Sequence, residues 1–189
     1  MARFTKAELQ GFRGAELPDL VGPGLKLLFV GINPGLWTAA VQTHFAHPAN
    51  RFYPALALAG ILERPVSPSD GMTDADREAF VARGLGITNL ARRATARADE
   101  LSAAELRTGG KRLVALVEEH RPRVVAVLGI TAYRSAFGAR GAVPGRQPGL
   151  LGGAELWVVP NPSGLNAHET IASLAEAYGA AARAAGILP

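Results

Sequence analysis

The sequence of 189 residues has no cysteine, few lysines and no long apolar run. The absence of cysteine excludes disulfides, thiolate nucleophiles, cysteine-ligated zinc and iron–sulfur clusters. The longest apolar stretches, such as Leu25 to Val30, are far too short to span a bilayer. The N-terminus also lacks the basic and then apolar pattern of a secretory signal. We therefore expect a cytoplasmic protein that does not associate with membranes.

The basic residues are nearly all arginine, since only Lys6, Lys26 and Lys111 are lysines. A net charge of +4 favours an anionic partner only weakly. Arginine can bind phosphate through two parallel hydrogen bonds. An arginine-rich composition is equally typical of GC-rich genomes, so both explanations remain open.

Apolar residues make up 48% of the chain, which is enough to bury a sizeable core. At roughly 150 residues per domain, the length fits about one domain. The prolines and glycines between Pro18 and Gly24 are typical of a linker. We therefore divide the chain into an N-terminal extension, residues 1–17, with a short helix that begins after Thr5, and a single domain, residues 18–189. A monomer is the default expectation.

Short apolar runs alternate with helical segments along the domain. The apolar runs predict four strands, at residues 25–30, 86–90, 124–128 and 156–159. Capping-box spacing after Thr73, Ser102 and Asn166 predicts three helix starts. Pro48 is expected in the first turn of a further helix that ends at Gly60. This alternation predicts an α/β fold with three layers around a mostly parallel sheet.

Two unusual loops follow predicted strands, at residues 31–35 (Gly-Ile-Asn-Pro-Gly) and 161–165 (Asn-Pro-Ser-Gly-Leu). Neither loop is a standard phosphate-binding loop, because the P-loop and dinucleotide-binding patterns are both absent. In parallel α/β sheets the ligand site lies beyond the carboxyl ends of the strands. We therefore expect any active site to lie between these two loops.

Together the two loops resemble the two motifs of the mismatch-specific uracil-DNA glycosylases, which are relatives of the thymine-DNA glycosylases. Residues 45–52 (Phe-Ala-His-Pro-Ala-Asn-Arg-Phe) match a segment typical of the bacterial branch. The resemblance extends in order from about Pro18 to the last helix. Another branch begins its first motif with Gly-Gln-Asp-Pro-Tyr-His, which is absent here, and the iron–sulfur branches require cysteines.

This resemblance implies a four-stranded parallel sheet between helices, in an α/β/α sandwich. It also implies removal of uracil opposite guanine in duplex DNA, with thymine and ethenocytosine as further candidate bases. The products are a free base and an abasic site, and neither a metal nor an organic cofactor is expected. A base within a duplex stack is inaccessible, so the nucleotide must be flipped into a pocket.

The resemblance assigns roles to several pocket residues. Asn33 would hold a water molecule beneath the anomeric carbon, although it cannot deprotonate it. The backbone amides of Ile32 and Phe45 would stabilise the departing uracil anion, and the Phe45 ring would stack on the flipped base. Ser163 would help to shape the pocket. Core packing for Phe45 and a simple turn for Ser163 are the alternatives.

Other residues are candidates for DNA binding. Leu165 would be the wedge that fills the space left by the flipped base, with the backbone at Gly164 facing the unpaired guanine. The alternative is that Leu165 packs under the last helix. Asn166 and His168 follow the wedge as candidate DNA contacts, although His168 also fits the first turn of a helix. A cluster of arginines is a candidate phosphate patch or simply a solvated surface: Arg92, Arg93 and Arg97.

Asp99 is a second candidate catalytic residue, because a carboxylate near the site can activate water as a general base. The alternative is an acid that complements the dipole of the helix after Ser102. Asn89 stands where the family often has a lysine. The pair Gly109-Gly110 inside a predicted helix indicates a close approach by a DNA strand or by another helix.

No lysine falls in the two motif loops, which argues against a Schiff-base lyase step and favours a monofunctional enzyme. Two other functions remain open. One is a non-catalytic protein that binds mismatches or damage, and the other is a nucleoside hydrolase. His44 and His47 have spacing that a metal could use, but no third ligand is evident.

Overall fold

Four parallel strands form the centre of the sheet, in the computed structural model, which describes residues 4–189. The strands are β1 (Leu27–Gly31), β2 (Leu85–Asn89), β3 (Val124–Leu128) and β5 (Ala154–Val159). Every residue of β1, β2 and β3 is buried. This burial explains why these segments are nearly continuous apolar runs rather than alternating ones. All four strands were predicted, within a few residues of their observed bounds.

The sheet has a fifth strand that was not predicted. β4 (Gly145–Leu151) pairs with β5 in the antiparallel direction, and the strand order is β2-β1-β3-β5-β4. The predicted sheet of four parallel strands is therefore wrong in its count, because the sheet is mixed and has five strands. β4 contains Pro148 and two glycines and is mostly exposed. These are features of an edge strand. Because β4 has no apolar run, the sequence pattern did not indicate a strand here.

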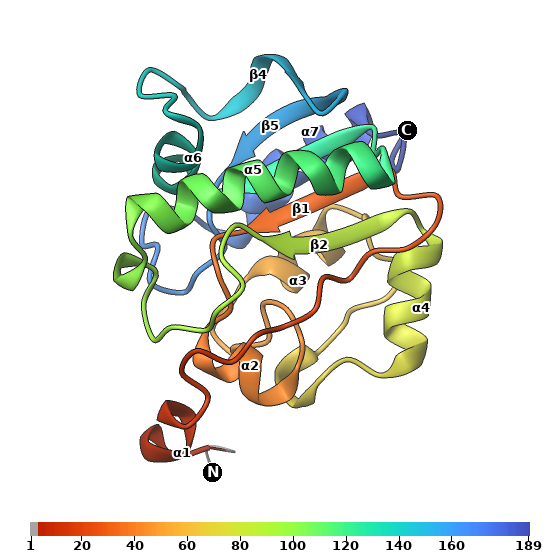
Figure 1. The fold of residues 1–189 in the computed structure, drawn as a ribbon. Coiled ribbons are helices and arrows are strands. Elements are labelled where there is room, and N and C mark those ends of the chain that lie inside the picture. Colours follow the sequence, from red (N-terminus) through yellow and green to blue (C-terminus); the bar gives the residue numbers. More distant parts are fainter. Residues whose placement is uncertain (1–3) are drawn as a thin grey trace.

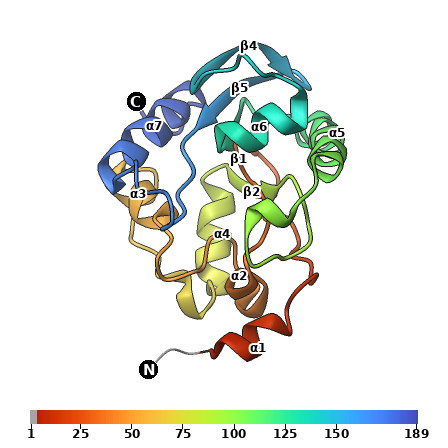
Figure 2. The same cartoon turned by 90° about the vertical axis from the view of Figure 1, so that its left-hand side faces the viewer.

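Helices cover both faces of this sheet, as Figures 1 and 2 show. On one face, α3 (Phe52–Leu58), α4 (Asp74–Ala82) and α7 (Ile171–Ala184) contribute to a core with Phe29 and Ala126. On the other face, α5 (Ala103–His120) and α6 (Ile130–Phe137) pack against alternate residues of the same strands. The three layers match the predicted architecture. Two short helices, α1 (Lys6–Gln10) and α2 (Leu36–Val41), lie beyond the sheet (Figure 1).

Three predicted capping boxes are present, at Thr5, Thr73 and Ser102. The predicted helix start at Asn166 is wrong, because α7 begins at Ile171 behind a capping box at Thr170.

The predicted start of α3 near Pro48 is also wrong. The Asn50 side chain accepts a hydrogen bond from the Phe52 backbone N–H, and α3 begins at Phe52. Within residues 4–189, no helix is both long enough and apolar enough to cross a membrane.

Close backbone packing explains the two glycines inside α5. A Cβ on Gly109 would lie 2.0 Å from the carbonyl oxygen of Leu90. A Cβ on Gly110 would lie 3.1 Å from the carbonyl oxygen of Ala136 in α6. Neighbouring protein backbone, rather than DNA, therefore accounts for both glycines.

Candidate active site

A cavity of about 560 Å³ lies beyond the carboxyl ends of β1 and β5. Both predicted loops, residues 31–35 and 161–165, line it. The other walls come from residues of the His44–Asn50 segment, from residues 95–98 and from α1. The two motifs are more than 120 positions apart in the sequence, and the parallel sheet brings them to one edge because it aligns the carboxyl ends of its strands.

Asn33 is held by its amide nitrogen. Its Nδ2 donates hydrogen bonds to the Thr95 hydroxyl at 2.7 Å, to the Pro34 carbonyl at 2.9 Å and, more weakly, to the Arg93 carbonyl at 3.4 Å. These contacts use the donor side of the amide. The side-chain oxygen Oδ1 has no hydrogen bond among the contacts of residues 4–189, so it is available to accept a hydrogen bond from a water molecule.

Thr95 is the residue that orients Asn33, and the sequence did not predict it. Its side chain is buried, and its hydroxyl donates to the Arg97 carbonyl at 2.6 Å while it accepts from Asn33. Because the Thr95 hydroxyl donates its hydrogen to the Arg97 carbonyl, the Thr95 oxygen can only accept a hydrogen bond from the Asn33 amide. Thr95 also pairs with Gly35 in a parallel β-bridge, so the loop at 95–98 is attached directly to the Asn33 loop.

Gly31, Phe45 and Asn89 meet at the base of the cavity. A Cβ on Gly31 would lie 2.3 Å from Asn89 Oδ1 and 3.1 Å from the Phe45 ring, so only glycine fits here. Phe45 has a left-handed backbone (φ 55°), which is strained for a residue with a side chain. The Phe45 ring packs on Phe52 with centroids 4.2 Å apart. Phe45 is half-buried. The cavity thus combines an aromatic ring with an amide side chain.

His44 fixes the orientation of the Asn89 amide. His44 Nε2 is 3.0 Å from the Pro18 carbonyl, which can only accept, so Nε2 carries the hydrogen. Nδ1 then accepts from Asn89 Nδ2 at 3.1 Å. Burial lowers the pKa of His44 to about 4, so the ring is neutral near pH 7. Asn89 therefore lies in the cavity as an oriented amide.

The second loop is held together by its own side chains and by Arg51. Asn161 Oδ1 accepts from the Ser163 N–H at 2.9 Å, and Asn166 Nδ2 donates to the Asn161 carbonyl at 3.1 Å. The Arg51 guanidinium donates to the carbonyls of Ser163 at 2.5 Å, Asn166 at 2.8 Å and Glu169. These bonds keep residues 163–169 in a loop. Arg51 lies in the matched 45–52 segment, but nothing in the sequence indicated this role.

This loop presents Leu165 to solvent. The Leu165 residue is 91% exposed, the largest exposure among the big apolar residues of the described chain. It does not pack under the last helix. Gly164 lies against Ala49, whose carbonyl oxygen would be 2.7 Å from a Cβ on Gly164. An apolar side chain held out from a fixed loop beside a cavity has the geometry of a wedge.

Each arginine of the predicted patch has an acidic side chain within 4.0 Å. Arg93 donates to both carboxylate oxygens of Glu105, at 2.6 and 3.2 Å. The Arg93 bonds, followed by those from Ser102, lower the pKa of Glu105 to about 2. Arg92 lies 4.0 Å from Glu16. The sequence shows the cations clustered, but it does not show which acids fold against them.

Asp99 lies just outside the cavity wall. It is in the 3₁₀ turn Ala98–Glu100, and its side chain is 63% exposed. Its carboxylate accepts from Arg97 at 2.6 and 3.2 Å. Asp99 is therefore not in the first turn of α5, whose cap is Ser102 with Glu105.

The structure brings only part of the predicted set to the cavity. The predicted residues that line it are Ile32, Asn33, Phe45, Arg97, Ser163, Gly164 and Leu165. The predicted residues outside the lining are Arg92, Arg93, Asp99, Asn166 and His168. His168 is exposed and lies in a turn before α7. In the part of the chain from residue 4 onward, no group of three or more histidines and acids could hold a metal ion.

Comparisons with known proteins show the family of the chain and a similar fold. The model of the uracil DNA glycosylase superfamily matches residues 18–181, and the chain belongs to that family. A solution NMR structure from Methanosarcina acetivorans, described as a candidate uracil DNA glycosylase, is similar in fold with a TM-score of 0.57. The two chains are 17% identical, and the match covers 89% of this chain and 96% of that one. At this identity the likeness concerns the fold alone.

Family membership supports a DNA glycosylase that acts on uracil, with DNA as its partner. The match begins at residue 18, at the boundary predicted for the N-terminal extension. Residues 4–17 therefore lie outside the family match, although α1 lines the cavity.

Proposed function

We propose that this chain is a monofunctional DNA glycosylase of the mismatch-specific kind, which removes uracil opposite guanine from duplex DNA. It flips the nucleotide into the cavity and leaves an abasic site, and it acts as a monomer. Thymine and ethenocytosine opposite guanine are further candidate bases. The observation that carries the proposal is the fixed Asn33 amide in a cavity that has Leu165 exposed at its edge.

The aromatic and amide groups of the cavity suit a uracil ring. Stacking on an aromatic side chain contributes about 1–3 kcal/mol per base, and the Phe45 ring is the candidate. Uracil leaves as an anion, so backbone N–H groups of Ile32 and Phe45 would stabilise the charge that develops on its oxygens. Asn89 adds an oriented amide that can bond to a base edge.

The attacking water requires a site on the opposite side of the sugar from the base. Asn33 Oδ1 can accept one hydrogen of that water, because Thr95 and Pro34 hold the amide nitrogen. An amide is not a base, so Asn33 positions the water without deprotonating it. The sugar develops oxocarbenium character as the bond to the base breaks, and the water then attacks.

Asp99 remains the candidate for activating that water. In the free protein its carboxylate is paired with Arg97, and an exposed ion pair of this kind is weak. A DNA phosphate that binds Arg97 would compete for this guanidinium. The Asp99 carboxylate would then be released beside the cavity, where it can accept a proton as a general base.

The experiment is single-turnover cleavage of a labelled duplex with one G·U pair, in the presence of EDTA. We expect cleavage of the G·U duplex, with Asn33→Ala and Asp99→Asn both slowed, and slower cleavage of A·U duplexes and single strands. Binding without cleavage by the natural protein would instead favour a damage-binding protein. Hydrolysis of free nucleosides at a similar rate would favour a nucleoside hydrolase.

Leu165→Ala tests the flipping step separately. We expect duplex cleavage to fall about tenfold, since the wedge no longer fills the space of the flipped base, while cleavage of single strands stays unchanged. Leu58→Ala is the matched control, because Leu58 is 63% exposed on α3 and does not line the cavity. Equal losses on duplex and single strand would contradict the wedge.

A further inference from the structure

The N-terminal segment, residues 4–17, lies outside the part of the chain that the family model matches, yet it forms a wall of the cavity. The family match begins at residue 18. Three side chains of α1 line the cavity together with the Asn33 loop and the Leu165 loop: Lys6, Leu9 and Gln10. The predicted extension is therefore part of the same cavity.

Apolar packing fixes this segment to the domain. Leu9 and Phe12 pack on a small core made by Leu36, Ala39 and Ala94. Phe4 makes an edge-to-face contact with Trp37, with ring centroids 5.1 Å apart.

Backbone and side-chain bonds attach the segment to the loop that holds Asn33. The Gly14 N–H donates to the Ala94 carbonyl at 2.9 Å, and the Ala94 N–H donates to the Ala15 carbonyl at 2.8 Å. Arg13 forms an ion pair with Glu100. These contacts border Thr95, the residue that orients Asn33, so α1 has a fixed position relative to the catalytic amide.

Lys6 differs from the arginines near the cavity because those arginines form ion pairs. Arg93 and Arg97 each have a carboxylate within 2.6 Å. Lys6 is exposed, and the ion pairs of residues 4–189 do not include it. Its ammonium group is thus a cation beside the cavity that no carboxylate of residues 4–189 binds in an ion pair. An ammonium group of this kind binds phosphate as a point charge.

We propose that residues 4–17 are part of the DNA-binding site of this protein and that Lys6 contacts a backbone phosphate next to the flipped nucleotide. This inference rests on the proposed function, since it requires DNA at the cavity. α1 supplies the cation, and its packing on Ala94 fixes the backbone from which the Lys6 side chain extends beside the cavity. The segment thereby adds a phosphate contact from outside the matched part of the chain.

The test is the salt dependence of single-turnover cleavage of a G·U duplex by the full chain and by Lys6→Gln. Each phosphate contact contributes about 0.9 to the slope of log affinity against log salt. We expect Lys6→Gln to lose about 0.9 of this slope. The enzyme concentration that gives half the maximal rate measures the affinity. The ratio of this concentration in Lys6→Gln to that in the natural protein should increase about 3.5-fold when the salt is lowered from 200 to 50 mM. The maximal rate should stay unchanged.

Two variants serve as controls. Lys111→Gln removes the same charge from an exposed position on α5 that does not line the cavity, and its slope should equal that of the natural protein. Lys6→Arg should restore the slope, because it keeps the positive charge.

Three results would overturn the inference. The first is an unchanged slope in Lys6→Gln while the natural protein cleaves DNA. The second is a borohydride-trapped covalent complex with DNA that Lys6→Gln abolishes, since Lys6 would then be a nucleophile. The third is a natural protein that neither binds nor cleaves the duplex, in which case the proposed function fails together with the inference.

Discussion

Two cavities of similar volume lie at opposite ends of the parallel strands. The one beyond the carboxyl ends measures about 560 Å³, and the one at the amino ends, beside Lys26 and the end of α4, about 520 Å³. β1 runs between them and has five residues, so about 17 Å of strand separates them. Size does not distinguish the two cavities, and the difference lies in the groups that line them.

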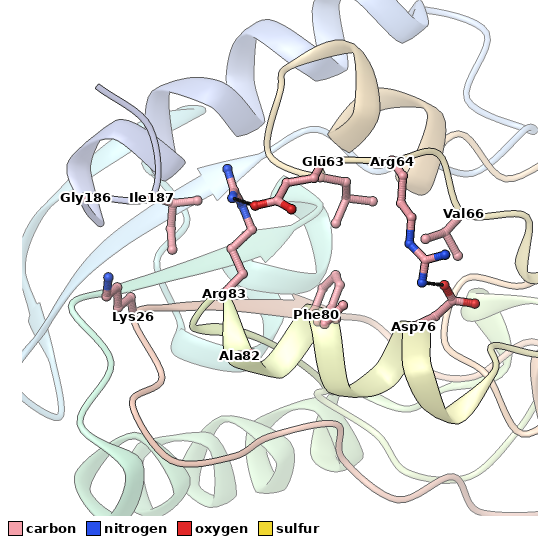
Figure 3. Close-up of a pocket in the computed structure, with 12 residues that line it drawn as sticks. Lys26, Glu63, Arg64, Val66, Asp76, Phe80, Ala82, Arg83, Gly186 and Ile187 are labelled. Atoms are coloured by element: carbon pink, nitrogen blue, oxygen red, sulfur yellow. Dashed lines mark hydrogen bonds and ion pairs between the residues drawn. The ribbon is translucent and has the colours of Figure 1, made fainter.

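Four of the charges that line the cavity at the amino ends form two ion pairs, whereas Lys26 takes part in none of the ion pairs among residues 4–189. Figure 3 shows Arg83 bonded to Glu63 and Arg64 bonded to Asp76, with Phe80 between the two pairs. The N–O distances are 2.9 and 2.7 Å.

The carboxyl-end cavity instead has oriented amides, a strained phenylalanine and an exposed leucine. A side chain that faces a cavity and still has a free hydrogen-bond donor or acceptor can bind a ligand. Side chains that are already bonded to one another instead stabilise the fold. The predictions below test this contrast, from the largest expected effect to the smallest.

Asn33→Ala should give the largest effect. Without the amide, the water beneath the sugar loses its acceptor, and loss of one oriented polar group at a reacting centre typically costs about 10²–10³ in rate. We expect a decrease of that size in single-turnover cleavage, with circular dichroism and Tm close to those of the natural protein. If Asn33→Ala cleaves within threefold of the natural rate, the carboxyl-end cavity is not where the bond breaks.

The sequence predicted those features of the site that depend on local patterns. Asn33 and Leu165 each lie in a short loop directly after a buried apolar run, and parallel strands place such loops at one edge. Contacts between distant segments leave no such pattern. Thr95 meets Asn33 across 62 positions, and Arg51 reaches the Ser163 carbonyl across 112. The same holds for Arg92, whose acidic partner Glu16 is far away in sequence.

The second prediction uses the buried histidine of the carboxyl-end cavity. The pKa of His44 is about 4 in the folded protein and about 6.5 when unfolded. Because the folded pKa is the lower one, stability is complete above about pH 6.5 and is lost as the pH falls toward 4. Between pH 7 and pH 5 the loss should be about 2 kcal/mol of unfolding free energy, measured by urea titration.

Two variants show whether this loss belongs to His44. His44→Gln cannot titrate, so its unfolding free energy should be nearly flat between pH 7 and pH 5. His47→Gln changes an exposed histidine that also lines the cavity, and it should keep the full loss because it leaves His44 in place. Glu105 does not interfere, because its pKa of about 2 affects stability only below its unfolded value of 4.5. A full loss in His44→Gln would assign the pH effect to other groups.

Thr95→Val should have a smaller effect on the rate than Asn33→Ala. Valine keeps the shape but leaves the Asn33 amide and the Arg97 carbonyl without their shared hydroxyl, at a cost of about 1–3 kcal/mol in stability for an unsatisfied buried group. The amide is then less well oriented, and we expect cleavage about tenfold slower. Thr95→Ser keeps the hydroxyl and should restore the rate. Equal rates for the valine and serine variants would show that Thr95 only packs.

The smallest effects should come from the amino-end cavity. Glu63→Gln and Arg64→Gln each break one exposed ion pair, and such pairs contribute little because water and salt screen them. We expect Tm to fall by no more than about 3 °C and cleavage to stay within twofold. The two cavities share no lining residue, so a charge lost at one end has no direct contact through which to reach Asn33. A tenfold loss of cleavage in either variant, with Tm unchanged, would mean that the two ends of the sheet are coupled and that pairing does not make the amino-end charges purely structural.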